Sequence, residues 1–397
     1  MVVVGPGLVV MLADTDAGSA IVAAQSGAQW GYRLLLLQLV LMPILYVVQE
    51  LTVRLGLVTR KGHGELIAEH FGRGWAWLSV ATLLVSCVGA MLTEFSGIAG
   101  VGLLFGISPW ISILLTVVFL VTVAATGSYR QVELIALAIG VFELAFVAVA
   151  CVSHPSGAAM LRGMVEIPLN NREYLLLLAS NVGAVVMPWM VFYQQSAVVD
   201  KGLKISHLKA ARLDTAIGAF VTQAIMAAIL ILAAATLGAK NSNATLNTVQ
   251  QIADALTPFL GSFWGKTIFA LGMLGAALVA TIVVSLTAAW GLGEVTGYKR
   301  SLAHHPFEAP WFYGIYVLSL LLGAAIVLSG VNLVKLAIGV NVMNALLLPI
   351  VLGFLFLLAR KALPEKWRLQ GWYAWLVGFI VLFTAGLGVY AGVRGIW

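Results

Sequence analysis

The fold is decided by residues 12–19, which read LADTDAGS in the middle of an apolar run at about residues 3–24. A helix needs about 20 residues to cross a hydrocarbon core roughly 30 Å thick, so this run is long enough to span a membrane. Asp14, Asp16 and the helix-weakening Gly18 fall near the middle of the expected bilayer. An ionised carboxylate is costly there and normally faces a cavity, a partner or a substrate. We therefore expect a broken helix that serves a function.

A second apolar run, at about residues 174–198, is interrupted where residues 183–189 read GAVVMPW. Pro188 lacks a backbone N–H and disrupts the helical turn before it. Broken helices are tolerated in a bilayer where the freed backbone groups line a cavity or meet a ligand. Two ordinary kinks in a packed bundle are the alternative, but they do not explain Asp14 and Asp16.

The composition places the whole chain in a membrane. Of its 397 residues, 61% are apolar and 10% are charged, compared with roughly 45–50% and about 25% in soluble domains. So few charges cannot cover a water-soluble surface. We expect an all-α membrane protein with about eleven transmembrane helices and no room for a soluble ATPase domain. The expected spans are about residues 3–24, 31–53, 76–104, 108–126, 130–152, 174–198, 214–237, 264–294, 312–330, 332–359 and 371–393.

The two breaks lie in the first members of two five-span blocks. Because five is odd, the blocks have opposite orientations, as in inverted-repeat transporters, whose substrate sites lie at the membrane midplane between two discontinuous helices. We therefore expect a single transmembrane transporter domain over residues 1–397. Its first repeat is expected at about 1–152, its second at about 174–359, and an extra helix at about 371–393.

The basic residues predict the orientation, because Lys and Arg favour short cytoplasmic loops. With the N-terminus in the cytoplasm, fifteen of the 22 basic residues lie inside and seven lie outside. We therefore expect a cytoplasmic N-terminus and an outside C-terminus. The net charge of +6 reflects this topology and does not indicate nucleic acid, and the sequence shows no sign of an obligate protein partner. The short loops favour a plasma membrane of the bacterial inner-membrane kind.

A cytoplasmic loop contains a short amphipathic segment at residues 63–71. Apolar and polar residues fall on opposite faces, which predicts a helix lying on the membrane surface. His63, Glu69 and His70 are expected on a solvated face, and a regulatory metal site formed by them is the less favoured alternative.

A bound cation is the simplest counter-charge for Asp16, because the cores of the neighbouring spans contain no basic residue. Asp16 would supply an anionic oxygen, Ser19 a hydroxyl, and Ala13 and Ala184 backbone carbonyls. These donors suit Mg²⁺, Ca²⁺ or Mn²⁺, whereas the thioether of Met187 favours softer transition metals. An equally good interpretation of Met187 is that its side chain packs between helices and does not bind a metal.

At these residues the sequence resembles the NRAMP family of divalent metal transporters. The likeness covers nearly the whole chain and includes residues 5–7 (GPG), 25–32 (QSGAQWGY) and 54–59 (RLGLVT), and Pro349 within residues 341–350. The resemblance implies a LeuT-like fold with a 5+5 inverted repeat and broken helices 1 and 6. It also implies a transporter and not an enzyme, with the metal as cargo and no resident cofactor.

The family's signatures are altered in this chain. The D-P-G-N motif of helix 1 stands as DAGS at residues 16–19, so the carboxylate is kept and the amide is lost. The A-x-x-M-P-H motif of helix 6 stands as AVVMPW at residues 184–189, so Trp189 replaces a histidine, and Asn341 takes the place of a helix 10 glutamine. The resemblance therefore implies a metal site formed by Asp16, Ser19, Ala184, Met187, Ala13 and Asn341.

The family's proton route is also incomplete. Glu94 matches a family carboxylate in helix 3, but Met91 replaces the aspartate one turn before it, and the helix 9 arginines have no counterpart. Histidine is the side chain whose pKa starts near neutrality, and it is lost from helix 6. We expect weak or absent proton coupling, with Asp14, Glu94 and Trp189 as candidates for coupling or supporting roles.

The altered signatures resemble those of the NRAMP-related branch that carries Mg²⁺. The smaller Ser19 leaves more room for an ion that keeps several waters, as Mg²⁺ does, whereas a retained Met187 favours Mn²⁺ or Fe²⁺. We expect Mg²⁺ transport with Mn²⁺ also carried. A proton-coupled Mn²⁺/Fe²⁺ importer is the first alternative, and an organic-solute carrier of the same fold is a weaker one. Glu143, a further acid within a span, is given no role.

Overall fold

The computed structural model describes residues 5–125, 128–153, 155–238, 246, 248–254, 257–330 and 332–397. Throughout these residues all regular structure is helical, which confirms the expected fold class. Among the described residues, nine helices are long and apolar enough to cross a membrane, and α1 (Pro6–Asp14) with α2 (Ala17–Trp30) forms a further span bent by 48°. The remaining expected span is α6 (Pro109–Ala125), an apolar helix of 17 residues.

The other spans lie within a few residues of the expected ones. They are α3 (Leu35–Thr59), α5 (Arg73–Leu104), α7 (Tyr129–Gly140) with α8 (Leu144–Val152), α10 (Arg172–Val185) with α11 (Pro188–Asp200), α12 (Leu208–Ala233), α14 (Thr257–Thr296), α15 (Pro310–Val327), α16 (Leu333–Lys361) and α17 (Gly371–Ile396). Short elements connect them: α4 (His63–Phe71), α9 (Gly157–Val165), α13 (Val249–Asp254), η1 (Val141–Glu143), η2 (Ile205–His207), η3 (Ala234–Gly238) and η4 (Glu365–Trp367). The first span was predicted too short, since α2 continues to Trp30.

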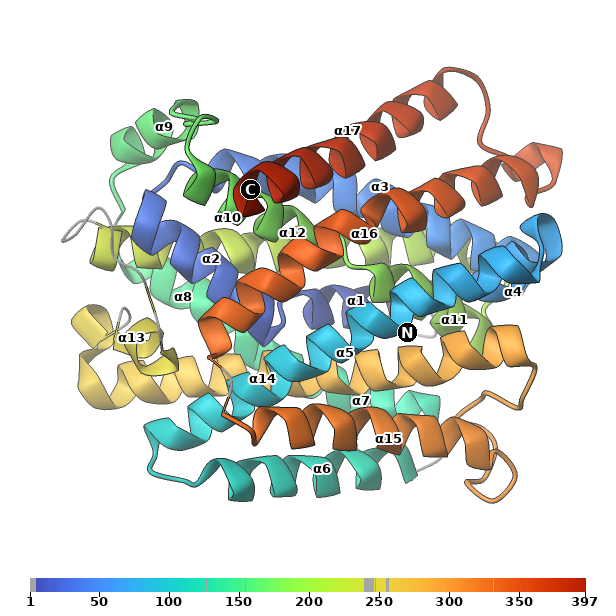
Figure 1. Ribbon diagram of the computed structural model, residues 1–397, viewed down its shortest axis with the longest axis horizontal. Coiled ribbons are helices and arrows are strands. Elements are labelled where there is room, and N and C mark those ends of the chain that lie inside the picture. Colours follow the sequence, from blue (N-terminus) through green and yellow to red (C-terminus); the bar gives the residue numbers. More distant parts are fainter. Residues whose placement is uncertain are drawn as a thin grey trace.

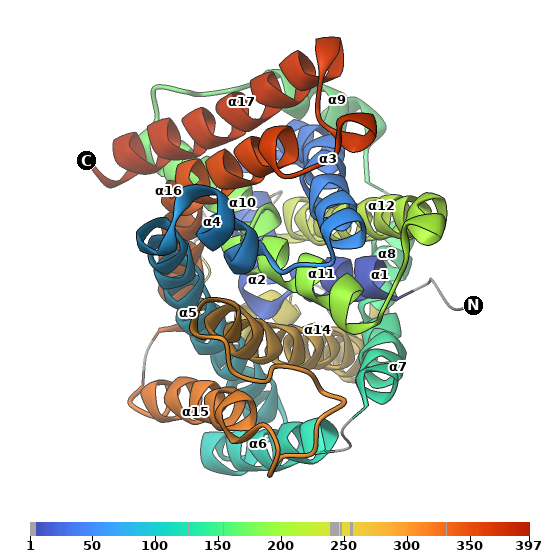
Figure 2. The ribbon, with the colours of Figure 1, turned by 90° about the vertical axis from the view of Figure 1, so that its right-hand side faces the viewer.

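The helices run mostly along the long axis of the molecule (Figure 1). Figure 2, viewed along that axis, shows α1, α2, α10 and α11 inside a ring of longer helices. The span formed by α10 and α11 is accordingly enclosed, with 94% of its most apolar stretch buried. The two interrupted helices therefore lie at the centre of the protein, away from lipid.

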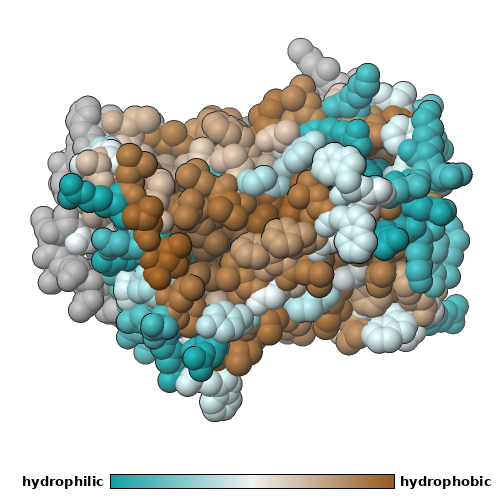
Figure 3. Space-filling model, turned by 90° about the horizontal axis from the view of Figure 1, so that it is seen from above, coloured by the Kyte–Doolittle hydropathy of each residue, from teal (hydrophilic) through white to brown (hydrophobic). Residues whose placement is uncertain are grey.

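The outer surface has the character of a protein surrounded by lipid. Figure 3 shows a broad hydrophobic band, with hydrophilic residues gathered most densely at the right-hand end, where Figure 1 places α4. Large apolar side chains such as Leu115, Phe220 and Leu382 are exposed on the spans. Exposed apolar area on this scale indicates contact with a membrane.

A buried carboxylate fixes the start of α1. Asp214 of α12 accepts hydrogen bonds from the backbone amides of Gly5, Gly7 and Leu8, the shortest being 2.8 Å from the Gly7 nitrogen. The first amides of a helix lack partners within the helix, and a negative charge there is favourable. Asp214 thereby anchors α1 to α12, so that the break at the end of α1 has a fixed position.

Local chemistry ends one half-helix and starts the next at both breaks. Asp16 is the N-cap residue of α2, and its Oδ1 accepts a hydrogen bond from the Ser19 backbone nitrogen at 2.6 Å, the usual role of aspartate there. In the other break, Val186 and Met187 separate α10 from α11, and Pro188 occupies the first position of α11. Proline is well suited to that position because a helix's first amide has no partner in any case.

Candidate functional site

A side-chain-to-backbone hydrogen bond joins the two breaks. The hydroxyl of Ser19, in the first turn of α2, donates to the carbonyl oxygen of Ala184 at the end of α10, with 3.0 Å between the oxygens. Asp16 lies one helical turn from Ser19, and all three residues are buried. The structure therefore brings together three residues that the sequence analysis assigned to one site.

The two carbonyl groups named in the sequence analysis have lost their usual helical partners. In a continuous helix the Ala184 carbonyl would accept from the residue four positions on, but that residue is Pro188, which has no N–H. The Ala13 carbonyl would accept from Ala17, but the Ala17 amide donates to Glu94 Oε2 at 3.1 Å. Both carbonyls thus lie at helix ends where backbone oxygens are available to a ligand.

Met187 and Trp189 flank the second break. Met187 has an extended backbone immediately before α11, and its side chain is buried. Trp189 is also fully buried, and its Nε1 has no hydrogen-bond partner within the described part of the chain. The thioether is therefore held where the second helix is interrupted, and its role as a ligand stays a prediction.

Asn341 approaches the site from α16. A Cβ atom added to Gly183 would lie 1.8 Å from the Asn341 carbonyl oxygen, so α10 and α16 are in direct backbone contact one residue before Ala184. The Asn341 side chain is buried, and its Oδ1 faces the amide of Asn344 at 3.5 Å. This placement puts Asn341 beside the second break without joining it to Asp16 or Ser19 by a direct hydrogen bond.

Four buried carboxyl groups surround the break between α1 and α2. Glu94 accepts from the Ala17 amide, which directly follows Asp16 in the chain, and from the Thr93 hydroxyl. Asp14 ends α1, and neither of its carboxylate oxygens has a hydrogen-bond partner in the described residues. The ion pairs that the structure describes include none of these acids.

Glu143 is the acid whose place the sequence analysis missed. It lies on η1, accepts a hydrogen bond from the Thr15 hydroxyl, and leaves its Oε1 without a partner in the described residues. Thr15 lies between Asp14 and Asp16, so Glu143 reaches the broken segment itself. Its position inside an apolar span could have indicated a role, because an acid there is energetically costly and normally faces a partner or a cavity.

The donors available to a cation at this site are mixed. Across the described ranges, no three His, Cys, Asp or Glu side chains are grouped so that they could hold a metal ion. A cation beside Asp16 would therefore depend on neutral oxygens and the thioether as well as on carboxylate. The predicted ligands are at most 2% exposed, so solvent does not reach these residues in this structure.

Several relatives found by comparison with characterised proteins share one name, divalent metal cation transporter MntH. The chain is 29% identical over 288 residues to the divalent metal cation transporter MntH of Yersinia enterocolitica, covering 71% of this chain and 70% of the relative. It is also 29% identical over 296 residues to the MntH of Chromohalobacter salexigens, covering 71% and 68%.

Solved structures show the same fold. The manganese transporter of Eremococcus coleocola, in complex with an aromatic bis-isothiourea compound, superposes with a TM-score of 0.77 at 19% identity, covering 99% of this chain and 86% of that protein. MhsT in complex with L-phenylalanine superposes with a TM-score of 0.63 at 15% identity, covering 98% of both chains. These likenesses confirm the LeuT-like fold. The family described as "Natural resistance-associated macrophage protein-like" matches residues 7–394, and the chain therefore belongs to the Nramp family.

Proposed function

We propose that this protein carries divalent metal ions across a membrane by alternating access. The hydrogen bond from Ser19 to the Ala184 carbonyl is the observation on which the proposal depends, because it holds two interrupted helices together beside the buried Asp16. Transporters with inverted repeats bind substrate between two such helices. The names of the MntH relatives and of the similar manganese transporter support a metal as the cargo and transport, not catalysis, as the activity.

The metal is coordinated by Asp16, Ser19, Met187 and the carbonyls of Ala13 and Ala184, with Asn341 close by. A single cap carboxylate with neutral oxygens suits a hard divalent ion that keeps part of its water shell. The side chain of Ser19 is smaller than the asparagine of the family pattern. It leaves room for an ion that keeps several waters, which supports Mg²⁺ as a substrate. The buried thioether of Met187 supports Mn²⁺ as a second substrate.

Transport is driven by the membrane potential without tight proton coupling. A divalent ion that moves inward through about 100 mV gains roughly 4.6 kcal/mol, twice the value for one elementary charge. Trp189 replaces the helix 6 histidine of the family pattern, and Met91 on α5 is an apolar buried residue where that pattern has an acid. The alternative is a proton-coupled Mn²⁺/Fe²⁺ importer, which the four buried acids of this site favour.

The excess of basic residues at one end supports an orientation in the membrane. Lys61, Arg73, Arg300 and Arg360 lie in the segments around α4 and the neighbouring helix ends. We assign this end to the cytoplasm, because basic residues favour cytoplasmic loops. The N-terminus is then cytoplasmic and the C-terminus is outside, in a plasma membrane of the bacterial inner-membrane kind.

Replacing Asp16 tests the site directly. Asp16→Ala removes the one carboxylate that caps α2 beside Ser19, and we expect Mn²⁺ uptake into proteoliposomes to fall by more than the roughly 10–100-fold that loss of an outer partner costs a metal site. Asp254→Ala, which alters an exposed acid on α13, serves as the control. Unchanged uptake in a folded Asp16→Ala variant would remove Asp16 from the site.

Replacing Met187 tests the thioether. Met187→Ala should lower Mn²⁺ uptake several-fold more than Mg²⁺ uptake, because sulfur binds the softer ion better. Met190→Ala removes an equal volume one turn further along α11, where the side chain is also buried, and should leave the ratio of the two rates unchanged. Equal losses for both metals in the Met187 variant would show that this residue only packs.

Proton coupling is tested by measuring internal pH during transport. Proteoliposomes that contain a pH-sensitive dye and a potassium-diffusion potential should take up Mn²⁺ while the internal pH follows that of protein-free liposomes. A proton ionophore should leave the uptake rate unchanged. Acidification that rises in proportion to the metal taken up would establish the proton-coupled alternative.

A further inference from the structure

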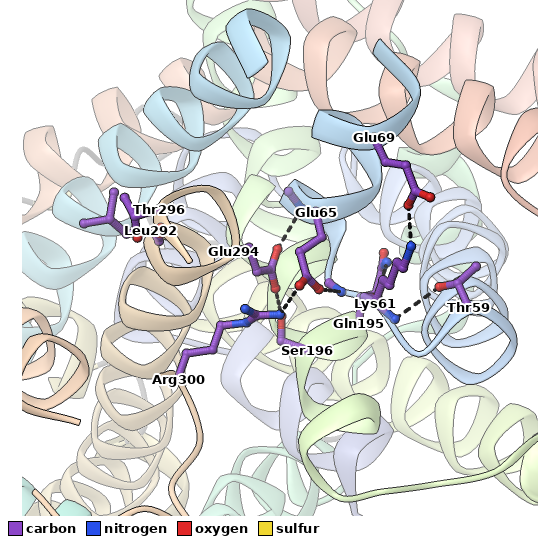
Figure 4. A network of polar contacts seen from close by, with 12 residues as sticks. Thr59, Lys61, Glu65, Glu69, Gln195, Ser196, Leu292, Glu294, Thr296 and Arg300 are labelled. Carbon is purple, nitrogen blue, oxygen red and sulfur yellow. Dashed lines mark hydrogen bonds and ion pairs between the residues drawn. The ribbon is translucent and has the colours of Figure 1, made fainter. Parts of the chain in front are cut away.

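The end of α11 that is distant from the metal site is fastened by a polar network. α11 begins next to Met187 and runs to Asp200, near the basic end of the molecule. Ser196 and Gln195, in its last two turns, contact the α3–α4 segment and α14 in this network (Figure 4). A helix that begins at the site therefore ends among contacts at the membrane surface.

Glu294, near the end of α14, occupies the middle of the network. Its Oε1 accepts from the Ser196 hydroxyl at 2.5 Å, and its Oε2 accepts from the Gly64 backbone nitrogen at 2.7 Å. The residue is 6% exposed. One buried carboxyl group thus connects α11, α4 and α14 through two hydrogen bonds.

The segment around Gly64 fits the carboxylate closely. A Cβ atom added to Gly62 would lie 2.0 Å from Glu294 Oε1, and one added to Gly64 would lie 3.2 Å from Oε2. The start of α4 can approach Glu294 because glycine occupies both positions. We call the contacts among Gly64, Ser196 and Glu294 the Glu294 clasp.

A second connection involves Gln195 and corrects an expectation from the sequence. The Gln195 side chain donates to the Lys61 carbonyl at 2.9 Å and lies 3.1 Å from Nδ1 of His63. His63 is fully buried, with its ring 4.9 Å from that of Phe192, so the prediction of a solvated histidine was wrong. Burial lowers the pKa of His63 to about 4, and the ring is therefore neutral near pH 7.

The outer contacts of the network are more exposed. Arg300 pairs with Glu65 at 2.6 Å, and Lys61 pairs with Glu69 at 2.6 Å, each with partly exposed side chains. Exposed ion pairs add little to stability, because water screens the charges. The buried bonds of Glu294 therefore matter more than the ion pairs around them.

A cavity of about 330 Å³ adjoins the clasp. Its lining includes Ser196, Trp290, Glu294 and Arg300, together with Asp200 and His304. The clasp forms part of its wall, on the side that we assign to the cytoplasm. A metal ion that left the site along α11 would pass from the closed centre of the protein into such a polar space.

We propose that Glu294 is a positioning residue that holds α11 in the inward-closed state, and that the Glu294 clasp opens when metal is released to the cytoplasm. This inference rests on the transport function proposed above. α11 cannot move away from α14 without breaking the hydrogen bond from Ser196 to Glu294, and it cannot move away from the α3–α4 segment without breaking the bond from Gln195 to the Lys61 carbonyl. The clasp therefore sets the balance between the closed state and an inward-open state, although it does not touch the metal.

Hydrogen–deuterium exchange on the full chain in lipid nanodiscs tests the clasp without measuring transport. In Glu294→Ala we expect amide exchange in peptides covering residues 62–71 and 190–200 to rise by about tenfold or more, because the buried Gly64 amide and Ser196 hydroxyl lose their acceptor. Glu69→Gln alters an exposed acid of the same network and should leave exchange unchanged. Ser196→Ala should give a smaller increase in the same two peptides.

Amide exchange in helices outside the network distinguishes a local opening of the clasp from a general loss of stability. α9, outside the network, should exchange at the wild-type rate in Glu294→Ala, and Mn²⁺ uptake should show a changed KM in a protein that still binds Mn²⁺. Unchanged exchange at α4 and α11, or an equal rise in all helices, would overturn the proposal. Failure of the wild-type protein to carry any divalent metal would overturn the proposed function, while a local exchange increase would still establish the clasp.

Discussion

The structure depends on a missing hydrogen-bond donor. Pro188 cannot donate to the Ala184 carbonyl, and that oxygen instead accepts the hydroxyl of Ser19 from the other interrupted helix. A carbonyl without a partner is costly in a bilayer. One proline therefore ends α10, starts α11, and gives the two half-helices a reason to meet at the centre of the protein.

Buried carboxylates likewise provide acceptors for backbone amides at the starts of helices. Asp16 caps α2, Asp214 caps α1, and Glu94 takes up the Ala17 amide that the break leaves without a helical acceptor. Capping with carboxylates is favourable because helix N-termini carry partial positive charge. Acids in this protein therefore hold the broken helix in place, and they also surround the position proposed for the cation.

Much of the fold could be predicted from the sequence, because each of its signals is local. Hydropathy located the spans, and Pro188 and the polar residues 14–19 located the breaks. Contacts between distant segments were not predictable in this way: Glu143 meets Thr15, Asp214 meets α1, and His63 is buried against Gln195. Each depends on how helices far apart in sequence pack, and an amphipathic pattern cannot distinguish a solvated histidine from one covered by another helix. The ligand roles were predicted from residue chemistry and stay predictions.

The two ends of α11 connect the proposed site to the proposed clasp: Met187 lies before its first turn, and Ser196 meets Glu294 near its last. We propose that the site carries a divalent ion and, through the Ser19 hydroxyl, accepts Mg²⁺. Uptake of Mg²⁺ by the reconstituted wild-type protein, alone and in competition with Mn²⁺, tests this most directly. We expect Mg²⁺ to enter and to slow Mn²⁺ uptake; millimolar Mg²⁺ that neither enters nor competes would show that Mg²⁺ is not a substrate.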